Sequence, residues 1–110
     1  MKHGLSAETV AAIHGVFDRH PAVEKAVLYG SRAKGNYQNG SDIDLTLFGE
    51  GLNDGELMNL IDELDELLLP FTIDLSIYAR LDQADLREHI QRVGVVFYTR
   101  KLSEQNGGGK

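Results

Sequence analysis

Two aspartates separated by one residue follow a glycine–serine pair at a defined distance in this chain. Gly30 and Ser31 come directly after an apolar run, and ten residues later Asp42 and Asp44 flank Ile43 at the start of another. If the second run is a strand, alternation points both aspartates to one face, with α-carbons about 6.6 Å apart at roughly 3.3 Å per residue. Carboxylates at this separation can converge on a hard cation. The segment therefore predicts a magnesium site beside a turn that binds phosphate.

A third aspartate lies in a second segment with the same alternation. Polar and apolar residues alternate through residues 72–78, and Asp74 lies on the polar side. Aspartate is disfavoured in strand interiors, and a single one would fit an ordinary solvated sheet face. Three carboxylates on neighbouring strands instead repel one another unless a cation lies among them. We therefore interpret Asp42, Asp44 and Asp74 as one metal-binding and catalytic set.

This combination resembles the nucleotidyltransferase superfamily that includes DNA polymerase beta, and in particular its minimal, single-domain branch. The family pattern is Gly-Ser, ten residues, Asp-x-Asp and then a carboxylate on a later strand, which is the arrangement described above. The extended form of the pattern is also present, in residues 30–35 and 41–45, and the resemblance covers about residues 23–98. A glycine–serine pair alone would carry no such information.

The resemblance implies a reaction and a cofactor. The expected donor is a nucleoside triphosphate, with ATP as the expected nucleotide, and pyrophosphate leaves when the nucleoside monophosphate is transferred to a hydroxyl. Asp42, Asp44 and Asp74 are the expected ligands of two Mg²⁺ ions, which stabilise the attacking and leaving oxygens. Asp74 is expected to serve the acceptor side and to help take the hydroxyl proton.

The same resemblance implies which residues bind the nucleotide. Gly30 lets the backbone approach the phosphates, and Ser31 supplies a hydroxyl and an N–H at the start of a short helix. Arg32 and Ser41 complete the expected nucleotide-binding set, with Arg32 neutralising phosphate charge. Whether Lys34 also contacts phosphate, or is simply a solvated helix residue, stays open.

The acceptor of the nucleotide is not fixed by the sequence. The resemblance implies a hetero-oligomer with a small helical protein of the HEPN type, in which this chain is the antitoxin of a toxin–antitoxin pair and adenylylates a tyrosine of its partner. Two alternatives stay open. The acceptor could be the hydroxyl of a small molecule, or the chain could be a non-enzymatic module that neutralises its partner by occlusion.

Composition and charge narrow the class of protein further. A chain of 110 residues is one domain, able to bury roughly two-thirds of its unfolded surface. The net charge is −6, and the eleven Lys and Arg residues are scattered, so we expect no direct nucleic-acid binding. The absence of cysteine excludes disulfides and thiolate metal sites. No apolar run suggests a signal peptide or a membrane span, so a soluble cytoplasmic protein is the default expectation.

The periodicity predicts an α/β fold of the α+β type, a single small domain (residues 1–102) with a mixed β-sheet and helices packed on one face. Ser6 is the expected N-cap of a first helix that stops before Pro21. A Gly-rich tail, residues 103–110, is expected to be flexible. The expected strands are about 25–29, 42–48, 71–78 and 95–98, and further helices are expected to begin near 31, near 53 and near 82.

Other motifs that bind phosphate or metal fail at identifiable positions. The glycine spacing of a P-loop is present, but Asn36 and Tyr37 stand where lysine and a hydroxyl residue are needed. The four histidines have no shared zinc spacing. His89 lies beside Ile90 on the last helix, and this position is more typical of a structural or surface residue than of a catalyst.

Overall fold

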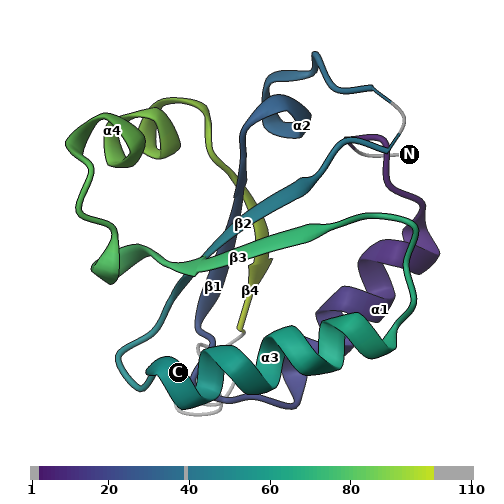
Figure 1. Cartoon of the computed structure of the whole chain (residues 1–110), viewed down its shortest axis with the longest axis vertical. Coiled ribbons are helices and arrows are strands. Elements are labelled where there is room, and N and C mark those ends of the chain that lie inside the picture. The colour runs from purple at the N-terminus through teal and green to yellow at the C-terminus, as the bar shows by residue number, and fades with distance from the viewer. Residues whose placement is uncertain (1–2, 39, 101–110) are drawn as a thin grey trace, which may run out of the picture.

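A four-stranded mixed β-sheet forms the centre of the computed structural model, which describes residues 3–38 and 40–100 (Figure 1). Its strand order is β3-β2-β1-β4. β2 runs parallel to β3, whereas β1 is antiparallel to both of its neighbours. The prediction of a mixed sheet is confirmed. The strands are β1 (Lys25–Tyr29), β2 (Ile43–Phe48), β3 (Ile73–Ile77) and β4 (Val95–Thr99).

The helices begin where the sequence offers side-chain caps. Ser6 accepts a hydrogen bond from the Thr9 N–H at 3.1 Å, and Asn53 accepts one from the Glu56 N–H at 2.8 Å. These contacts satisfy amide groups that the first turn of a helix leaves unpaired. They confirm the predicted N-cap Ser6 and the predicted start of a helix near residue 53. The helices are α1 (Ala7–Asp18), α2 (Ser31–Lys34), α3 (Asp54–Glu66) and α4 (Ala84–Val93), with a short 3-10 turn η1 (Tyr78–Arg80).

The strand predicted from about residue 71 begins later in the structure, at Ile73, and the helix before it, α3, ends at Glu66. Leu68 has a φ of +55°, a left-handed conformation that a helix cannot continue through, so the helix stops before Pro70 is reached. The predicted tail, residues 103–110, lies outside the described residues.

The main core lies between one face of the sheet and the pair α1 and α3, which lie side by side in Figure 1. Along β2 every second residue enters this core, so Ile43, Leu45 and Leu47 are all fully buried. α1 also turns an apolar face toward the sheet, with Ile13, Val16 and Phe17 fully buried. Alternation in strands and helical spacing in α1 therefore meet on one shared interior.

α4 lies on the opposite face of the sheet and departs from the prediction that helices pack on one face only. Ile90 packs there with Val27 and Tyr29 of β1 and with Tyr78. The reason is chemical: β1 is apolar on both faces, so its second apolar side also needs cover. The predicted fold class is otherwise confirmed, and among the described residues no helix is long and apolar enough to cross a membrane.

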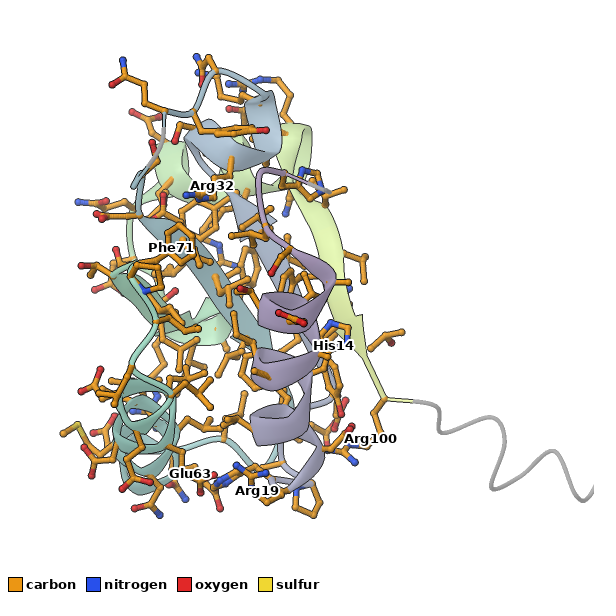
Figure 2. The ribbon with its side chains drawn as sticks, turned by 90° about the vertical axis from the view of Figure 1, so that its right-hand side faces the viewer. His14, Arg19, Arg32, Glu63, Phe71 and Arg100 are labelled. Carbon is orange, nitrogen blue, oxygen red and sulfur yellow. The ribbon has the colours of Figure 1, made fainter. Side chains whose placement is uncertain are left out.

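Side chains at the lower rim join α1 to its neighbours (Figure 2). Arg19 of α1 points to Glu63 of α3, with 2.9 Å between Nη2 and Oε1. Arg100, just after β4, donates to the backbone oxygens of Phe17, His20 and Val23 at the end of α1. These bonds tie the end of β4 to the end of α1 and to the segment that leads from α1 into β1.

Candidate functional site

A row of three polar side chains crosses the sheet on the face that α4 covers. Asp44 of β2 is the register partner of Asp74 in parallel β3 and of Tyr29 in antiparallel β1. Partners in register point to the same face, so Tyr29, Asp44 and Asp74 lie side by side on three adjacent strands. The sequence predicted the two aspartates on one face of neighbouring strands, and the register brings them directly opposite each other.

The glycine–serine turn lies against this row. Gly30 has a φ of +78°, which favours glycine, and a Cβ built there would collide with the carboxylate of Asp44. The position therefore excludes a side chain for two reasons, backbone conformation and lack of space. The Asp44 carboxylate thus lies directly against Gly30. The predicted phosphate-binding turn and the predicted metal ligand are therefore neighbours in space.

The carboxylates of the site interact through their charges. Burial raises the pKa of Asp44, and the negative charges of Asp74 and Asp42 raise it further, whereas His89 acts in the opposite direction. Burial likewise raises the pKa of the Tyr29 phenol; a hydrogen bond with Ser76 opposes this, and the charges of Asp74 and Asp44 add to it. Asp42 and Asp74 are therefore close enough to act on Asp44, as expected for groups that share a cation.

The three aspartates differ in exposure. Asp42 precedes β2 and is exposed, Asp74 is exposed at the edge strand, and Asp44 between them is partly buried. Within residues 3–38 and 40–100, no three acidic or histidine side chains are gathered closely enough to form a ready-made metal site. The carboxylates of the three aspartates nevertheless fit Mg²⁺. This ion binds proteins through one or two carboxylates together with the phosphates of the substrate.

The floor of the site, further along the same strands, is closed by a pair of hydroxyls. The Ser76 hydroxyl donates to the Thr46 hydroxyl at 2.9 Å, and Thr46 is fully buried. Each lies two residues after an aspartate of the row and therefore on the same face. This bond ties β2 to β3 directly below Asp44 and Asp74, which keeps the two carboxylates in register.

Arg32 lies away from solvent, at 2% exposure, although the resemblance placed it on the nucleotide. Its Nε and Nη2 donate to the Ser41 carbonyl at 3.1 and 2.8 Å, and its Nη1 donates to the His3 carbonyl at 2.8 Å. The guanidinium carbon is also 5.2 Å from the ring centre of Tyr37 and 4.9 Å from that of Phe71 (Figure 2). In this conformation Arg32 holds the loop before Asp42 to the N-terminal segment.

The other expected nucleotide-binding residues lie around the same loop. Ser31 begins α2 directly after Gly30, and its carbonyl accepts the Gly35 and Asn36 N–H groups. The Ser41 hydroxyl oxygen accepts the Gln38 N–H at 2.8 Å, so this side chain helps to shape the loop. Lys34 is exposed at the end of α2. Ser31 thus directly follows the glycine that lies against Asp44, whereas Ser41 lies one residue before Asp42.

Two residues facing the aspartates were not singled out for this site in the sequence. Tyr29 joins the row only through the strand register, which the sequence does not reveal. His89 of α4 has its ring centre 6.2 Å from that of Tyr29, in an edge-to-face arrangement. A signal for His89 does exist, because Leu86, His89, Ile90 and Val93 follow the i, i+3, i+4, i+7 spacing of one helix face. That spacing indicates a histidine turned toward the sheet.

Solved structures share this fold. A toxin–antitoxin structure with AMP-PNP gives a TM-score of 0.66 at 19% identity, over 92% of this chain and 79% of that chain. A structure of tri-AMPylated Shewanella oneidensis HEPN toxin in complex with MNT antitoxin gives 0.60 at 18% identity, over 89% and 76%. An MntA–HepT toxin–antitoxin structure gives 0.63 at 17% identity, over 91% and 78%. At these identities the likeness concerns the fold.

Sequence comparison identifies the family independently. No curated protein matches the chain. The family model described as "Polymerase beta, Nucleotidyltransferase" matches residues 11–103, which include the glycine–serine turn and all three aspartates. The resemblance seen in the sequence is thereby confirmed. With the turn, the aspartate row and the sheet arranged as described, the chain belongs to the polymerase beta nucleotidyltransferase family.

Proposed function

We propose that this chain is a magnesium-dependent nucleotidyltransferase that transfers AMP from ATP to a hydroxyl, and that the acceptor is a tyrosine of a HEPN-type partner. One observation carries the proposal. Asp44 lies against the Gly30 turn and directly opposite Asp74, so a phosphate-binding turn and two carboxylates meet at one point of the sheet. A fold without this chemistry has no need for interacting acidic groups on a partly buried face.

Each residue of the site has a defined role in this proposal. Asp42, Asp44 and Asp74 would hold two Mg²⁺ ions, and Gly30 and Ser31 would receive the phosphates. Bound Mg²⁺ would neutralise phosphate charge and stabilise the attacking and leaving oxygens.

The chain's own residues position the reactants and move a proton. Asp74 accepts the proton of the acceptor hydroxyl while the hydroxyl oxygen bonds to the α-phosphorus. The bond between the α-phosphorus and the oxygen that bridges to the β-phosphate breaks, and that oxygen leaves with pyrophosphate. Arg32 contributes indirectly, because its bonds to the Ser41 and His3 carbonyls hold the loop that carries Asp42.

The proposed acceptor and partner follow from the structural neighbours. One of them is an AMPylated HEPN toxin with its MNT antitoxin, and another is a toxin–antitoxin structure with AMP-PNP. Those descriptions belong to those proteins, and they support the same donor, acceptor class and antitoxin role for this chain.

The experiment is an acceptor search with labelled ATP. The purified chain is incubated with Mg²⁺, ATP labelled at the α-phosphate and lysate of its source organism, and labelled products are identified by mass spectrometry. We expect one small helical protein labelled on a tyrosine. The matched control is Asp44→Asn, which keeps the size of the side chain and removes its charge, and which should abolish the labelling.

Each other outcome selects a different function. A labelled metabolite would replace the protein acceptor by a small-molecule hydroxyl. Stable binding to a helical partner without any labelled product, in the presence of Mg²⁺ and ATP, would favour neutralisation by occlusion. Labelling that is equal for the wild type and Asp44→Asn would show a contaminating enzyme, and it would remove the support for catalysis by this chain.

A further inference from the structure

Arg32, the cation expected to neutralise phosphate charge, binds backbone carbonyls of the protein in this structure. The inference that follows rests on the proposed function, since it concerns how the same site holds its nucleotide. A triphosphate carries several negative charges and needs hydrogen-bond donors besides its metal ions. Arg32 is 2% exposed, and all three of its guanidinium nitrogens already donate to the Ser41 and His3 carbonyls.

His89 is a nitrogen-bearing side chain that faces the row from above. It lies on α4, which is anchored to the sheet by Ile90, packed among Val27, Tyr29 and Tyr78. The imidazole meets the Tyr29 ring edge-to-face, with 6.2 Å between ring centres and 81° between planes. Because His89 precedes Ile90 on the same apolar stripe, the packing that fixes the helix also fixes the direction of the imidazole.

The helix is held closely at this place. Gly94, the residue after α4, donates its N–H to the Ile90 carbonyl at 2.7 Å, and a Cβ at Gly94 would collide with that carbonyl and with Val27. β4 begins immediately afterwards and pairs with β1. The C-terminal half of α4, where His89 lies, is thus tied to the strand that ends in the Gly30 turn.

The imidazole lies over the part of the row that adjoins the Gly30 turn. Tyr29, whose ring it contacts edge-to-face, is the residue directly before Gly30 on β1. The Asp44 carboxylate, which lies against Gly30, is also within electrostatic reach of His89. A phosphate group bound at this turn would therefore come close to the imidazole.

We propose that His89 contacts the triphosphate of the bound nucleotide, donating an imidazole N–H to a phosphate oxygen above the Gly30–Ser31 turn. This makes His89 a nucleotide-binding residue supplied by α4, opposite the turn that approaches the phosphates from the strand side. The contact needs only one N–H, which a neutral imidazole also offers. The competing interpretation is that His89 merely packs its ring against Tyr29.

The test compares Mg²⁺–ATP affinity in the full chain by calorimetry, without an acceptor. His89→Ala should weaken ATP binding about tenfold, the effect of one lost hydrogen bond to a charged group. His89→Gln, which keeps an N–H donor, should restore affinity to within about threefold of the wild type. In transfer assays the KM for ATP should rise with the same order, while the rate at saturating ATP changes much less.

Gln91→Ala is the matched control on the same helix. Gln91 donates to the Tyr78 hydroxyl at 2.8 Å, so its loss loosens α4 without touching the imidazole. A loss of affinity in Gln91→Ala equal to that in His89→Ala would assign the effect to packing of α4 and overturn the inference. The inference would also fail if the two His89 variants bound equally poorly, or if both matched the wild type.

The wild-type measurement separates the two levels of the argument. A wild-type chain that does not bind Mg²⁺–ATP would contradict the proposed function itself. A wild-type chain that binds Mg²⁺–ATP, with His89→Ala unchanged, would leave the proposed function intact and reject only the role of His89. Thermal unfolding of each variant confirms that the compared proteins are folded.

Discussion

The two faces of the central sheet are made by the same strands but serve different purposes. Toward α1 and α3, β2 presents Ile43, Leu45 and Leu47, all fully buried in the main core. Toward α4, the same strand presents Asp44. Burial and the negative charges of Asp74 and Asp42 raise the pKa of this carboxyl group. One face gains free energy of folding by excluding water, and the other places charge where folding alone would avoid it.

The difference shows that stability and chemistry are divided by single positions in this sequence. Neighbouring residues of β2 point to opposite faces, so a change at one position should affect folding and a change at the next should affect transfer. Like charges that no ligand neutralises lower the free energy of unfolding. A face that keeps them therefore indicates a functional site and not a stabilising one. Substitutions at adjacent positions of β2 therefore test whether folding and transfer are separated in this way.

The largest expected effect is on nucleotidyl transfer in Asp44→Asn. The amide keeps the size of the carboxylate but not its charge, so the transfer rate should fall by about three orders of magnitude or more. The free energy of unfolding of the metal-free protein should stay the same or rise, because the buried charge and its repulsion from Asp74 and Asp42 are gone. Single-turnover transfer and urea unfolding measure the two quantities.

Leu45→Ala, one residue further on, is the contrast that makes this result interpretable. Removing a fully buried leucine should lower the free energy of unfolding by about 2–5 kcal/mol, since a cavity replaces its contacts. The fraction that remains folded should keep most of its transfer rate. If Leu45→Ala lost transfer as completely as Asp44→Asn while still folded, the two faces would not be separable in the way proposed.

The second effect, about a hundredfold on turnover, should distinguish Asp74 from Asp42. In the proposed function Asp74 serves the acceptor side, so Asp74→Asn should lower the transfer rate and leave much of the Mg²⁺–ATP affinity. Asp42→Asn should reduce both, because it removes a ligand of the donor-side metal. Calorimetric titration with Mg²⁺–ATP, combined with single-turnover transfer, gives the two quantities for each variant.

The outcome for Asp74 also tests the row across the strands. Equal loss of ATP affinity in the two variants would place Asp74 in the donor site together with Asp42. Unchanged transfer in Asp74→Asn would remove it from the mechanism, despite its register with Asp44. Ser76→Ala, which removes the hydroxyl bonded to Thr46 below the row, is the control for strand position and should have the smaller effect.

The apolar face could be predicted from the sequence, because its signals are local. Alternation in 43–48 and helical spacing in α1 each assign residues to the core without knowledge of any other element. The pair Asp42 and Asp44 was assigned to one strand for the same reason. Local capping contacts at Ser6 and Asn53 likewise fixed the start of two helices.

The polar face was harder to predict because it depends on contacts between distant segments. That Tyr29 meets Asp44, and Asp44 meets Asp74, is a matter of register between three strands, which no local pattern specifies. The burial of Arg32 depends on its bond to the carbonyl of His3, 29 residues away. The cover of this face by α4 follows from the two-sided apolar character of β1, which five residues reveal only weakly.

The smallest expected effect is on the pH dependence of stability. It concerns His20, which follows α1 and contacts two glutamates of α3. The His20 ring is within 2.6 Å of a Glu63 oxygen through Nε2 and 3.1 Å of a Glu56 oxygen through Nδ1. Burial alone lowers the pKa of His20, but hydrogen bonds and charge interactions with Glu63 and Glu56 outweigh it, so the pKa lies above its ordinary value. The hydrogen bond from His20, together with that from Arg19, also lowers the pKa of Glu63.

A raised pKa of a base means that the folded state holds its proton more tightly than the unfolded chain. The stabilisation is therefore complete below the unfolded pKa, near 6.5, and is lost as pH rises through the higher folded value. The difference in unfolding free energy between the wild type and His20→Gln should accordingly shrink as pH rises from 6 to 8 in urea unfolding. Arg19→Gln removes the other cation bound to Glu63, and because arginine does not titrate there, its difference from the wild type should stay nearly constant. If the difference in unfolding free energy between the wild type and His20→Gln stayed constant or grew with pH, the charge of the imidazole would not contribute. His20 would then link α1 to α3 only as a neutral hydrogen-bonding group.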